Sequence, residues 1–340
     1  MLKLLIGGSP CTHWSIAQTK NRETEPSGIG WELFENYLIA LEKFKPDCFL
    51  YENNKSMSTA IREEITKCLG VEPICINSAL VSAQNRQRLY WVGKRNSDGT
   101  YSRVDVEQPE DKGILLMDIL EQKPEPFETV RYEIIDGQTL MSTKDRMRQA
   151  NKRGSRQGTY VYFPNAEKAN TLLAAHAKDE MVILPVSPFV LQNYGCEITN
   201  TYEVLNGEIS VFGEKYRVNL LDGYWYIRHL TLTECKRLQT VPDGYVFPVS
   251  DTQAYKMLGN GWTVDVIAHI LSHCPGITAE LLDVLSMYDG MACGHIALDK
   301  LGCNIARYRA TEIDKYAIKT ACYNFPDIEQ LGDAFQVRGW

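Results

Sequence analysis

Reactive chemistry is concentrated first at Gly7–Cys11, which follows the apolar residues Leu4–Ile6. An apolar run that ends in two glycines is typical of a buried strand leading into a tight turn. Pro10 fixes its own φ angle and lacks a backbone N–H, so the approach to the cysteine is stiff. Because the thiolate is the nucleophilic form, catalysis at Cys11 requires surroundings that lower the thiol pKa. A structural cysteine in a strand–turn unit is the alternative interpretation.

A second group of polar side chains follows the apolar segment Cys48–Tyr51, where Glu52–Asn54 stand at the end of a predicted strand. Strand ends of this kind carry the sites of open α/β sheets. Further on, Gln84, Arg86 and Arg88 alternate along another predicted strand, so their side chains should share one face. Two fixed cations there can hold a carboxylate and a polar ligand. A basic face paired with surface acids is the alternative.

The C-terminal part has the pattern of a nucleotide-binding half-sheet. The apolar strand predicted over Leu281–Tyr288 is followed by the glycine-containing turn Asp289–Gly294. An acid, Glu312, follows the next predicted strand about 20 residues on, and Asp333 follows a third. Carboxylates at these positions can accept hydrogen bonds from ribose hydroxyls and an adenine amine.

Length and composition indicate an ordinary globular protein, because 340 residues with 44% hydrophobic and 23% charged residues can bury a full core in two domains. We expect a cytoplasmic protein, since we find neither a membrane-spanning apolar run nor a signal peptide. The ten cysteines form no CxxC pair, which favours reduced thiols and predicts no metal site.

The net charge of −7 argues against a nucleic-acid partner, but the charge is unevenly distributed. Met141–Gln157 contains six cations and a single acid, Asp145. This stretch could meet phosphates or form a solvated loop. Its basic residues are Lys144, Arg146, Arg148, Lys152, Arg153 and Arg156.

Apolar periodicity divides the chain into three parts: a first α/β part over 1–123, a mostly β or irregular domain over 124–226, and a second α/β part over 227–340. Thr12–Gly30 is polar and is expected to be a mobile loop. His269 and His273 share a helix face, which we interpret as ordinary surface. Helices are predicted over Trp31–Phe44, Ser58–Leu69, Ile114–Leu120, Arg228–Leu238 and Val264–His273, and a strand over Val71–Ile76.

Taken together, these motifs resemble those of the DNA (cytosine-5) methyltransferases. The resemblance covers nearly the whole chain outside 124–226. It is carried by GGSPC at 7–11, EN at 52–53, QNRQR at 84–88, RHLTLTECKRLQTVPDGY at 228–245, LGNGW at 258–262, YDGMACG at 288–294, TEID at 311–314 and GD at 332–333.

The resemblance implies a role for each catalytic residue. Cys11 would be the nucleophile that adds to C6 of a flipped-out cytosine. Glu52 would protonate or hydrogen-bond N3 of the base, and burial would favour its protonated form. Arg86 and Arg88 match the pair that orients Glu52 and the base O2. Gln84, together with Ser9 and the six basic residues of 144–156, is a predicted DNA contact.

The resemblance also implies S-adenosyl-L-methionine as the methyl donor. Two departures concern its site: YDGMACG stands where bacterial members commonly have FxGxGG, and GNGW has Gly-Trp where many have Ser-Val. Both resemble the vertebrate de novo enzymes. The residues predicted to bind this cofactor are Tyr288, Asp289, Gly290, Met291, Ala292, Cys293, Glu312, Ile313, Asp333, Ala334, Phe335, Asn260, Gly261 and Trp262.

The motif order departs from the family, because the cofactor half comes last. We therefore expect an α/β fold: a Rossmann-like methyltransferase sheet, circularly permuted between its third and fourth strands, with a smaller mostly β or irregular target-recognition domain. Only Ala334–Trp340 follow Asp333 and only Met1–Lys3 precede the Pro-Cys strand. A parallel crossover needs a dozen or more residues. A helix on that face should be missing, abbreviated or supplied by another chain.

The expected function is sequence-specific cytosine methylation of duplex DNA in a prokaryotic or phage setting. A cognate restriction enzyme is a possible partner, and a monomer is favoured. An RNA cytosine-5 methyltransferase and a catalytically inactive DNA-binding module are the alternatives. The size of 124–226, typical of a domain, favours DNA over RNA, and Cys11, Glu52, Arg86 and Arg88 argue against an inactive module.

Overall fold

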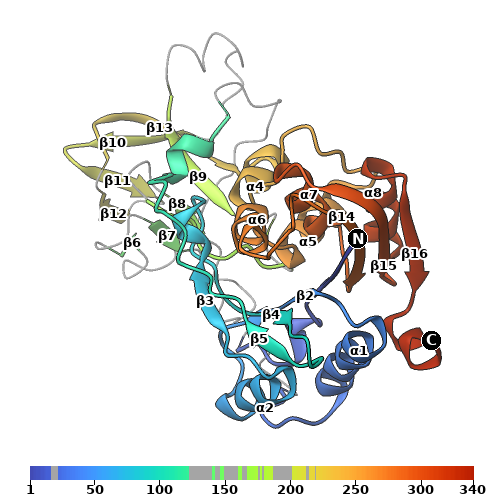
Figure 1. The fold of residues 1–340 in the computed structure, drawn as a ribbon. Coiled ribbons are helices and arrows are strands. Elements are labelled where there is room, and N and C mark those ends of the chain that lie inside the picture. The colour runs from blue at the N-terminus through green and yellow to red at the C-terminus, as the bar shows by residue number, and fades with distance from the viewer. Residues whose placement is uncertain are drawn as a thin grey trace.

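The fold was determined as a computed structural model. It describes residues 1–16, 22–121, 140–141, 146–148, 160–162, 167–174, 177, 180–186, 201–211, 214–218 and 220–340. In these ranges the chain forms two sheets with helices packed on the first (Figure 1). No helix among the described residues is long and apolar enough to cross a membrane.

The first sheet has the strand order β16-β15-β14-β1-β2-β4-β3, with β5 added beside β4. The five strands from β16 to β2 are parallel, and β4 runs antiparallel to β2, β3 and β5. Its strands are β1 (Leu2–Gly7), β2 (Cys48–Asn54), β3 (Ile74–Asn77), β4 (Gln87–Arg95), β5 (Tyr101–Arg103), β14 (Leu281–Met287), β15 (Asn304–Thr311) and β16 (Ile328–Gly332).

The first strand of the chain lies between a C-terminal strand and β2. In the register of the sheet, Gly7 of β1 is paired with Met287 of β14 on one side and with Tyr51 of β2 on the other. The segments from the two ends of the chain therefore form one continuous sheet, and the predicted mostly parallel α/β sheet is confirmed.

Helices cover both faces of this sheet. Alternation along β1 sends Leu4 and Ile6 to a core shared with α6 and α7, and Leu5 to an aromatic core under α1 and α2. The helices are α1 (Ile29–Phe44), α2 (Thr59–Leu69), α4 (Leu232–Leu238), α5 (Asp251–Asn260), α6 (Val264–Ser272), α7 (Cys293–Lys300) and α8 (Lys315–Asn324). The 3-10 helices include η1 (Cys11–His13), η2 (Ser78–Leu80), η3 (Leu116–Ile119) and η6 (Ala334–Gly339).

The second sheet has the order β12-β11-β10-β13-β9-β8-β7-β6 and is antiparallel except between β8 and β9. It lies to one side of the first sheet (Figure 1). Its core includes Met181, Ile183 and Trp225. The strands are β6 (Leu140–Met141), β7 (Arg146–Arg148), β8 (Tyr160–Tyr162), β9 (Met181–Pro185), β10 (Thr201–Leu205), β11 (Glu208–Val211), β12 (Glu214–Arg217) and β13 (Gly223–His229).

Several predicted elements differ from those observed. The helix predicted from Arg228 begins at Leu232, because Arg228 belongs to β13, which pairs with β9. Thr231 caps this helix by accepting a hydrogen bond from the Glu234 N–H. Leu258–Asn260 end α5 rather than forming a turn. The apolar segments near residues 74 and 116 form only a short strand and a 3-10 helix.

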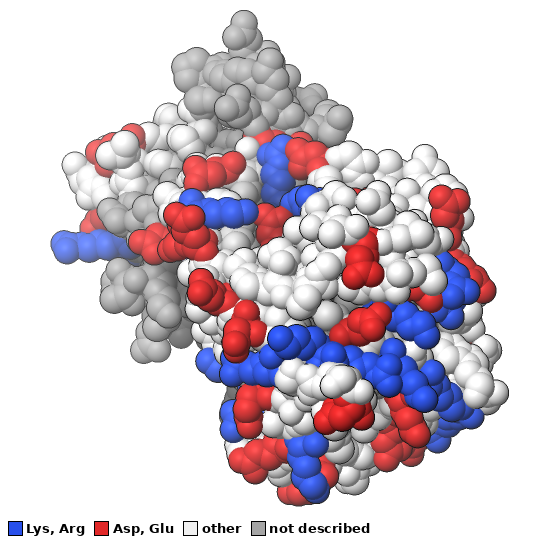
Figure 2. Space-filling view, in the orientation of Figure 1, with Lys and Arg blue, Asp and Glu red and all other residues white. Residues whose placement is uncertain are grey.

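The described chain after β16 consists of η6, which packs against α1. Lys43 of α1 donates to the carbonyls of Val337 and Trp340 at 3.0 and 2.7 Å. Across the molecule, Lys and Arg side chains gather in a band over part of the visible face, with acids interspersed (Figure 2).

Candidate active site

Cys11 lies just beyond the carboxyl end of β1, in the centre of the first sheet. Pro10, with φ −49° and ψ 117°, leads into η1, which begins at Cys11. Asn54, at the end of β2, donates from Nδ2 to the Cys11 carbonyl at 3.4 Å. The thiol borders a cavity of about 1260 Å³. The predicted strand–turn–cysteine unit is therefore present and opens into a cavity.

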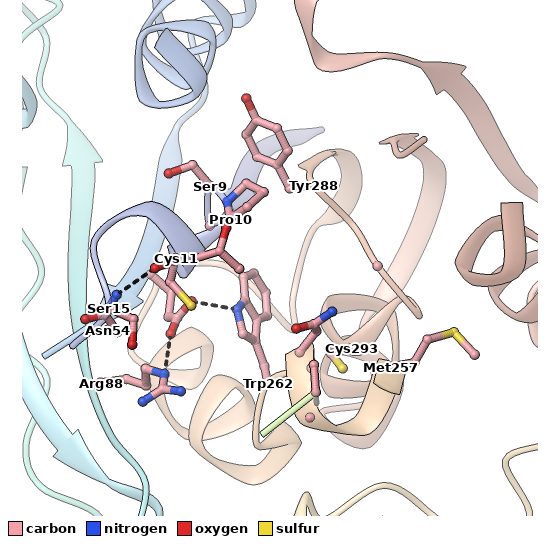
Figure 3. Close-up of a pocket in the computed structure, with 18 of the residues that line it drawn as sticks. Ser9, Pro10, Cys11, Ser15, Asn54, Arg88, Met257, Trp262, Tyr288 and Cys293 are labelled. Atoms are coloured by element: carbon pink, nitrogen blue, oxygen red, sulfur yellow. Dashed lines mark hydrogen bonds and ion pairs between the residues drawn. The ribbon is translucent and has the colours of Figure 1, made fainter. Parts of the chain in front are cut away.

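Glu52 reaches the same cavity from β2, and each of its carboxyl oxygens has a separate partner. Oε1 lies 3.2 Å from Nε of Arg88, and Oε2 accepts a hydrogen bond from the Trp262 indole N–H at 3.0 Å. Figure 3 shows Arg88 and Trp262 near Cys11, with Trp262 between Cys11 and Cys293. The predicted association of Glu52 with Arg88 is thus present in the structure.

Burial controls the protonation of both reactive groups. Burial raises the pKa of Glu52, and Arg88, Arg86 and the Trp262 hydrogen bond only partly oppose it. The direction agrees with our expectation that this carboxyl retains a proton more readily than usual. Burial also raises the pKa of Cys11, although Arg88 lowers it. Our expectation that the surroundings lower this thiol pKa is therefore wrong for the protein without substrate, because desolvation outweighs the arginine.

Arg86 does not share a strand face with Arg88, because β4 begins only at Gln87. Its guanidinium is buried and donates to three backbone carbonyls: Leu172 at 2.9 Å, Gly259 at 3.1 Å and Gly261 at 2.9 Å. Burial and the nearby Arg88 lower its pKa to about 10. Arg86 was predicted to form, with Arg88, the pair that orients Glu52 and the base O2. Its hydrogen bonds go to the backbone around the cavity, and it interacts with Glu52 electrostatically.

Two predicted DNA contacts have buried side chains with protein partners. Gln84 precedes β4 and is fully buried; it donates to the Leu238 carbonyl at 3.0 Å and accepts from the Leu172 N–H at 2.9 Å. In this structure its role is to join backbone segments. The Ser9 hydroxyl is hydrogen-bonded to the Tyr51 hydroxyl at 2.7 Å, although Ser9 borders the cavity.

The predicted basic stretch falls largely outside the part of the chain that the structure describes. Arg146 and Arg148 are described only as backbone of β7. The remaining members of the stretch, Lys144, Lys152, Arg153 and Arg156, lie outside the described residues.

The turn after β14 has an unusual backbone. Tyr288, Gly290 and Ala292 all have positive φ, at 61°, 59° and 62°. Left-handed conformations at non-glycine residues are costly and cluster at functional sites. α7 starts directly afterwards at Cys293. This turn therefore presents successive backbone groups and a helix start to the cavity.

Asp289 is the buried carboxylate of this turn. Its Oδ1 accepts hydrogen bonds from the hydroxyls of Ser286 at 2.6 Å and Tyr308 at 2.7 Å. Its Oδ2 is buried and has no hydrogen-bond partner among the described residues. Burial raises the pKa of Asp289 to about 6. Since Asp289 borders the cavity, this oxygen is a candidate acceptor for a ligand.

The acids predicted after the next two strands lie around the same cavity. Glu312 follows β15 and accepts from the Gly290 N–H at 2.8 Å, while Asp333 follows β16 and caps η6 through the Phe335 N–H at 2.9 Å. Ile313 is 73% exposed and provides an apolar surface between them. All predicted cofactor residues border the cavity except Ala292, which is buried behind the turn.

Some bordering residues were not predicted. Leu33 of α1 and Met257 of α5 both line the cavity, as does the segment around Leu173. Met257 precedes Gly261 by about one helical turn, but α5 was not predicted as a helix, so its position relative to the site could not be inferred. Among the described residues no cluster of His, Cys, Asp or Glu could hold a metal ion.

Comparison with known proteins shows the family to which the chain belongs. The model of the C-5 cytosine-specific DNA methylase family matches residues 2–275, so the chain belongs to that family. The type II methyltransferase M1.ScrFI of Lactococcus lactis subsp. cremoris is 28% identical over 293 residues, which are 83% of this chain and 62% of that protein. The type II methyltransferase M.HpaII of Haemophilus parainfluenzae is 29% identical over 277 residues, 78% of this chain and 69% of that protein.

Among solved structures, the Entamoeba histolytica methyltransferase EhMeth aligns with 80% of this chain and 76% of its own, with 14% identity and a TM-score of 0.49. The chain spans less than two thirds of the length of M1.ScrFI. The residues beyond the family match, 276–340, contain β14, β15 and β16.

Proposed function

We propose that this chain transfers a methyl group from S-adenosyl-L-methionine to C5 of cytosine in a specific sequence of duplex DNA. The observation that carries the proposal is the single cavity bordered by Cys11, Glu52 and the turn after β14. Membership of the C-5 cytosine methylase family supports it. The thiol and the cofactor turn come from opposite ends of the chain, and only the shared sheet brings them together.

The residues of the turn suit the proposed cofactor. The unpartnered Oδ2 of Asp289 suits an ammonium group, and Glu312, which borders the cavity, would accept hydrogen bonds from ribose hydroxyls. Ile313 and Phe335 offer apolar surface to an adenine ring. When bound, S-adenosyl-L-methionine supplies the methyl group for C5. Backbone N–H groups at the start of α7 suit a carboxylate.

Cys11, Glu52 and Arg88 have separate proposed roles toward the cytosine base. The Cys11 thiolate adds to C6, which requires the cytosine to leave the base stack, because a side chain cannot reach C6 inside the duplex. Glu52 hydrogen-bonds or protonates N3 and so stabilises the negative charge that develops on the cytosine ring when the thiolate adds. Arg88 holds Glu52 and would donate to the base O2. After C5 is methylated, the C5 proton passes to solvent water, the C6–S bond breaks, and the electron pair leaves with sulfur as the Cys11 thiolate, which releases the product.

We further propose that residues 124–226, including most of the second sheet, read the DNA sequence, with 1–123 and 227–340 forming the methyltransferase core. Side chains at groove edges distinguish base pairs, and the cations of 144–156 would meet phosphates. The biological setting would be modification in a prokaryote or phage, with a restriction enzyme of the same specificity as partner. We propose a cytoplasmic monomer, and gel filtration tests its oligomeric state.

The test uses the full chain, S-adenosyl-L-methionine and plasmid DNA, with 5-methylcytosine measured by mass spectrometry of nucleosides. We expect 5-methylcytosine with the parent protein and none with Cys11→Ser. Cys68→Ser is the matched control, since Cys68 is exposed on α2 and does not border the cavity. Absence of the product with folded parent protein, or its formation by Cys11→Ser, would overturn the proposal.

A competition assay with duplex DNA and RNA distinguishes the substrate class. Preferential methylation of RNA would replace the DNA proposal with an RNA methyltransferase. Bisulfite sequencing of an expression plasmid then gives the recognised sequence, which the described residues do not reveal.

A further inference from the structure

The turn between α5 and α6 is held rigidly against the core. Arg86 donates to the carbonyls of Gly259 and Gly261, and Gln239 donates from Nε2 to the Gly261 carbonyl at 3.3 Å. Thr263 donates from Oγ1 to Oε1 of Gln239 at 2.9 Å. The side chains of Arg86, Gln239 and Thr263 are buried; Gly259 is buried too, and Gly261 is half-buried. The position of the next side chain in the turn, Trp262, is therefore fixed from both sides.

The indole of Trp262 points at the carboxyl of Glu52. Its N–H donates to Oε2 at 3.0 Å, while Arg88 occupies Oε1. A Cβ placed on Gly8 would lie 2.9 Å from the same Oε2, so the Gly8 backbone also passes close to this oxygen. Glu52 thus has a different donor on each oxygen, and one of them belongs to a turn more than 200 residues away in sequence.

We propose that Trp262 is a positioning residue for Glu52, which sets the plane of the carboxyl that acts on N3 and joins this acid to the cofactor side of the cavity. The inference rests on the proposed function. A carboxyl that must direct one oxygen at a ring nitrogen loses efficiency when it rotates, and a small misplacement of a reacting group is costly. Arg86 acts on Glu52 indirectly, by holding the turn that carries Trp262.

Trp262 can contact both Glu52 and the proposed cofactor, because its ring borders the same cavity as the turn after β14. It lies between Cys11 and Cys293, the first residue of α7 (Figure 3). A substitution that removes the indole N–H but keeps an aromatic ring therefore separates the contact with Glu52 from the contact with the proposed cofactor. Trp262→Phe loses the donor to Glu52 but still presents an aromatic face to the cavity.

The groups that influence the charge of Glu52 come from several elements. Arg88 on β4 and Arg86 just before it favour the ionised form, as does the Trp262 donor. Cys11 of η1, Tyr51 of β2 and Tyr90 of β4 also interact electrostatically with Glu52. Loss of the indole donor should therefore raise the pKa of Glu52 further.

The first experiment measures single-turnover methyl transfer to DNA and the Kd of S-adenosyl-L-methionine for Trp262→Phe. A hydrogen bond to a charged group implies a fall in rate of roughly 10- to 100-fold, and we expect the Kd to change less than about threefold, since the aromatic face is kept. Trp91→Phe is the matched control. Trp91 is buried and donates to Thr66 Oγ1 at 2.9 Å, outside the cavity, and its rate should match the parent.

The second experiment places the same substitution in the Glu52→Gln background. If Trp262 acts through Glu52, Trp262→Phe should lower the residual rate there by less than about threefold, because coupled residues are not additive. Three results would each overturn the proposal. Trp262→Phe could lower the methyl-transfer rate equally in the parent and in the Glu52→Gln protein, it could leave the rate of the parent unchanged, or it could weaken only the binding of S-adenosyl-L-methionine.

A third readout does not depend on methyl transfer. Infrared difference spectra of the Glu52 carboxyl, identified by its disappearance in Glu52→Gln, give its titration in the folded protein. We expect a higher pKa in Trp262→Phe than in the parent or in Trp91→Phe. An unchanged titration contradicts the positioning role. A parent protein without methyltransferase activity but with this shift would refute the proposed function and leave the Trp262 contact supported.

Discussion

Gly8 lies where the Pro-Cys turn passes close to the carboxyl of Glu52, so Gly8→Ala should disturb the proposed active site without removing a functional group. A Cβ at this position would lie 2.8 Å from the Glu52 carbonyl oxygen and 2.9 Å from Oε2. Ordinary contacts begin at 3.4 Å, so the two segments must separate by about 0.5 Å. The carbonyl belongs to β2, which can shift only slightly because it is paired with β1 on one side and with β4 on the other.

The separation moves Glu52 relative to Cys11, which follows three residues after Gly8. A misplacement of about 1 Å can cost on the order of 100-fold in rate, so we expect a fall of about 10- to 100-fold for half that distance. Overpacking should also lower the free energy of unfolding by about 1–3 kcal/mol. The assays are single-turnover methyl transfer and urea denaturation.

Gly244→Ala is the matched control for this prediction. Gly244 is exposed, has no positive φ, and a Cβ there meets nothing within 4 Å. It should keep the parent rate and stability. A folded Gly8→Ala protein whose rate is within about threefold of the parent would refute the argument that this glycine is required by the approach of Glu52.

Three further predictions concern buried groups. Arg228→Met breaks the fully buried pair in which Arg228 Nη2 lies 2.7 Å from Glu234 Oε1, and it should cost about 3–5 kcal/mol in urea denaturation; a loss under 1 kcal/mol contradicts this. Gly259→Ala places a Cβ 2.3 Å from the Ala174 backbone nitrogen and should lower the melting temperature more than Gly244→Ala does; equal melting temperatures count against the packing. Burial raises the pKa of Asp289 from 3.8 to about 6, so the folded state binds more protons than the unfolded state and loses stability as pH rises through this window. Asp289→Asn lacks this loss and should be the more stable protein at pH 8, by on the order of 3 kcal/mol at most, with the difference vanishing below pH 4; a difference that does not depend on pH is the contrary result.

The sequence was enough to predict site residues whose position depends on the local strand that carries them. Cys11 and Glu52 each follow an apolar strand, and parallel neighbouring strands bring their carboxyl ends together at one edge. Glu312 and Asp333 reached the cavity by the same rule. Local pattern therefore sufficed for the strand ends, whereas the order of the two halves was inferred from the family resemblance.

Long-range contacts explain what was missed. Arg86 has a motif position next to Arg88, but its donors are used by carbonyls at Gly259 and Gly261, whose location depends on the packing of α5 and α6. Gly259 suggested a turn, whereas a helix passes there and glycine is needed for the approach of Ala174. The raised Cys11 pKa could not be inferred either, because burial is a property of the assembled site.

The most direct test of the account asks whether the thiol at one end of the chain and the cofactor turn at the other form one site. Duplex DNA containing 5-fluorocytosine in the recognised sequence is incubated with the full chain, with and without S-adenosyl-L-methionine, and the protein–DNA adduct is mapped by peptide mass spectrometry. We predict a stable adduct at Cys11 that requires the methyl donor and is lost in Cys11→Ser. An adduct on another cysteine, or none with folded protein, would contradict the account.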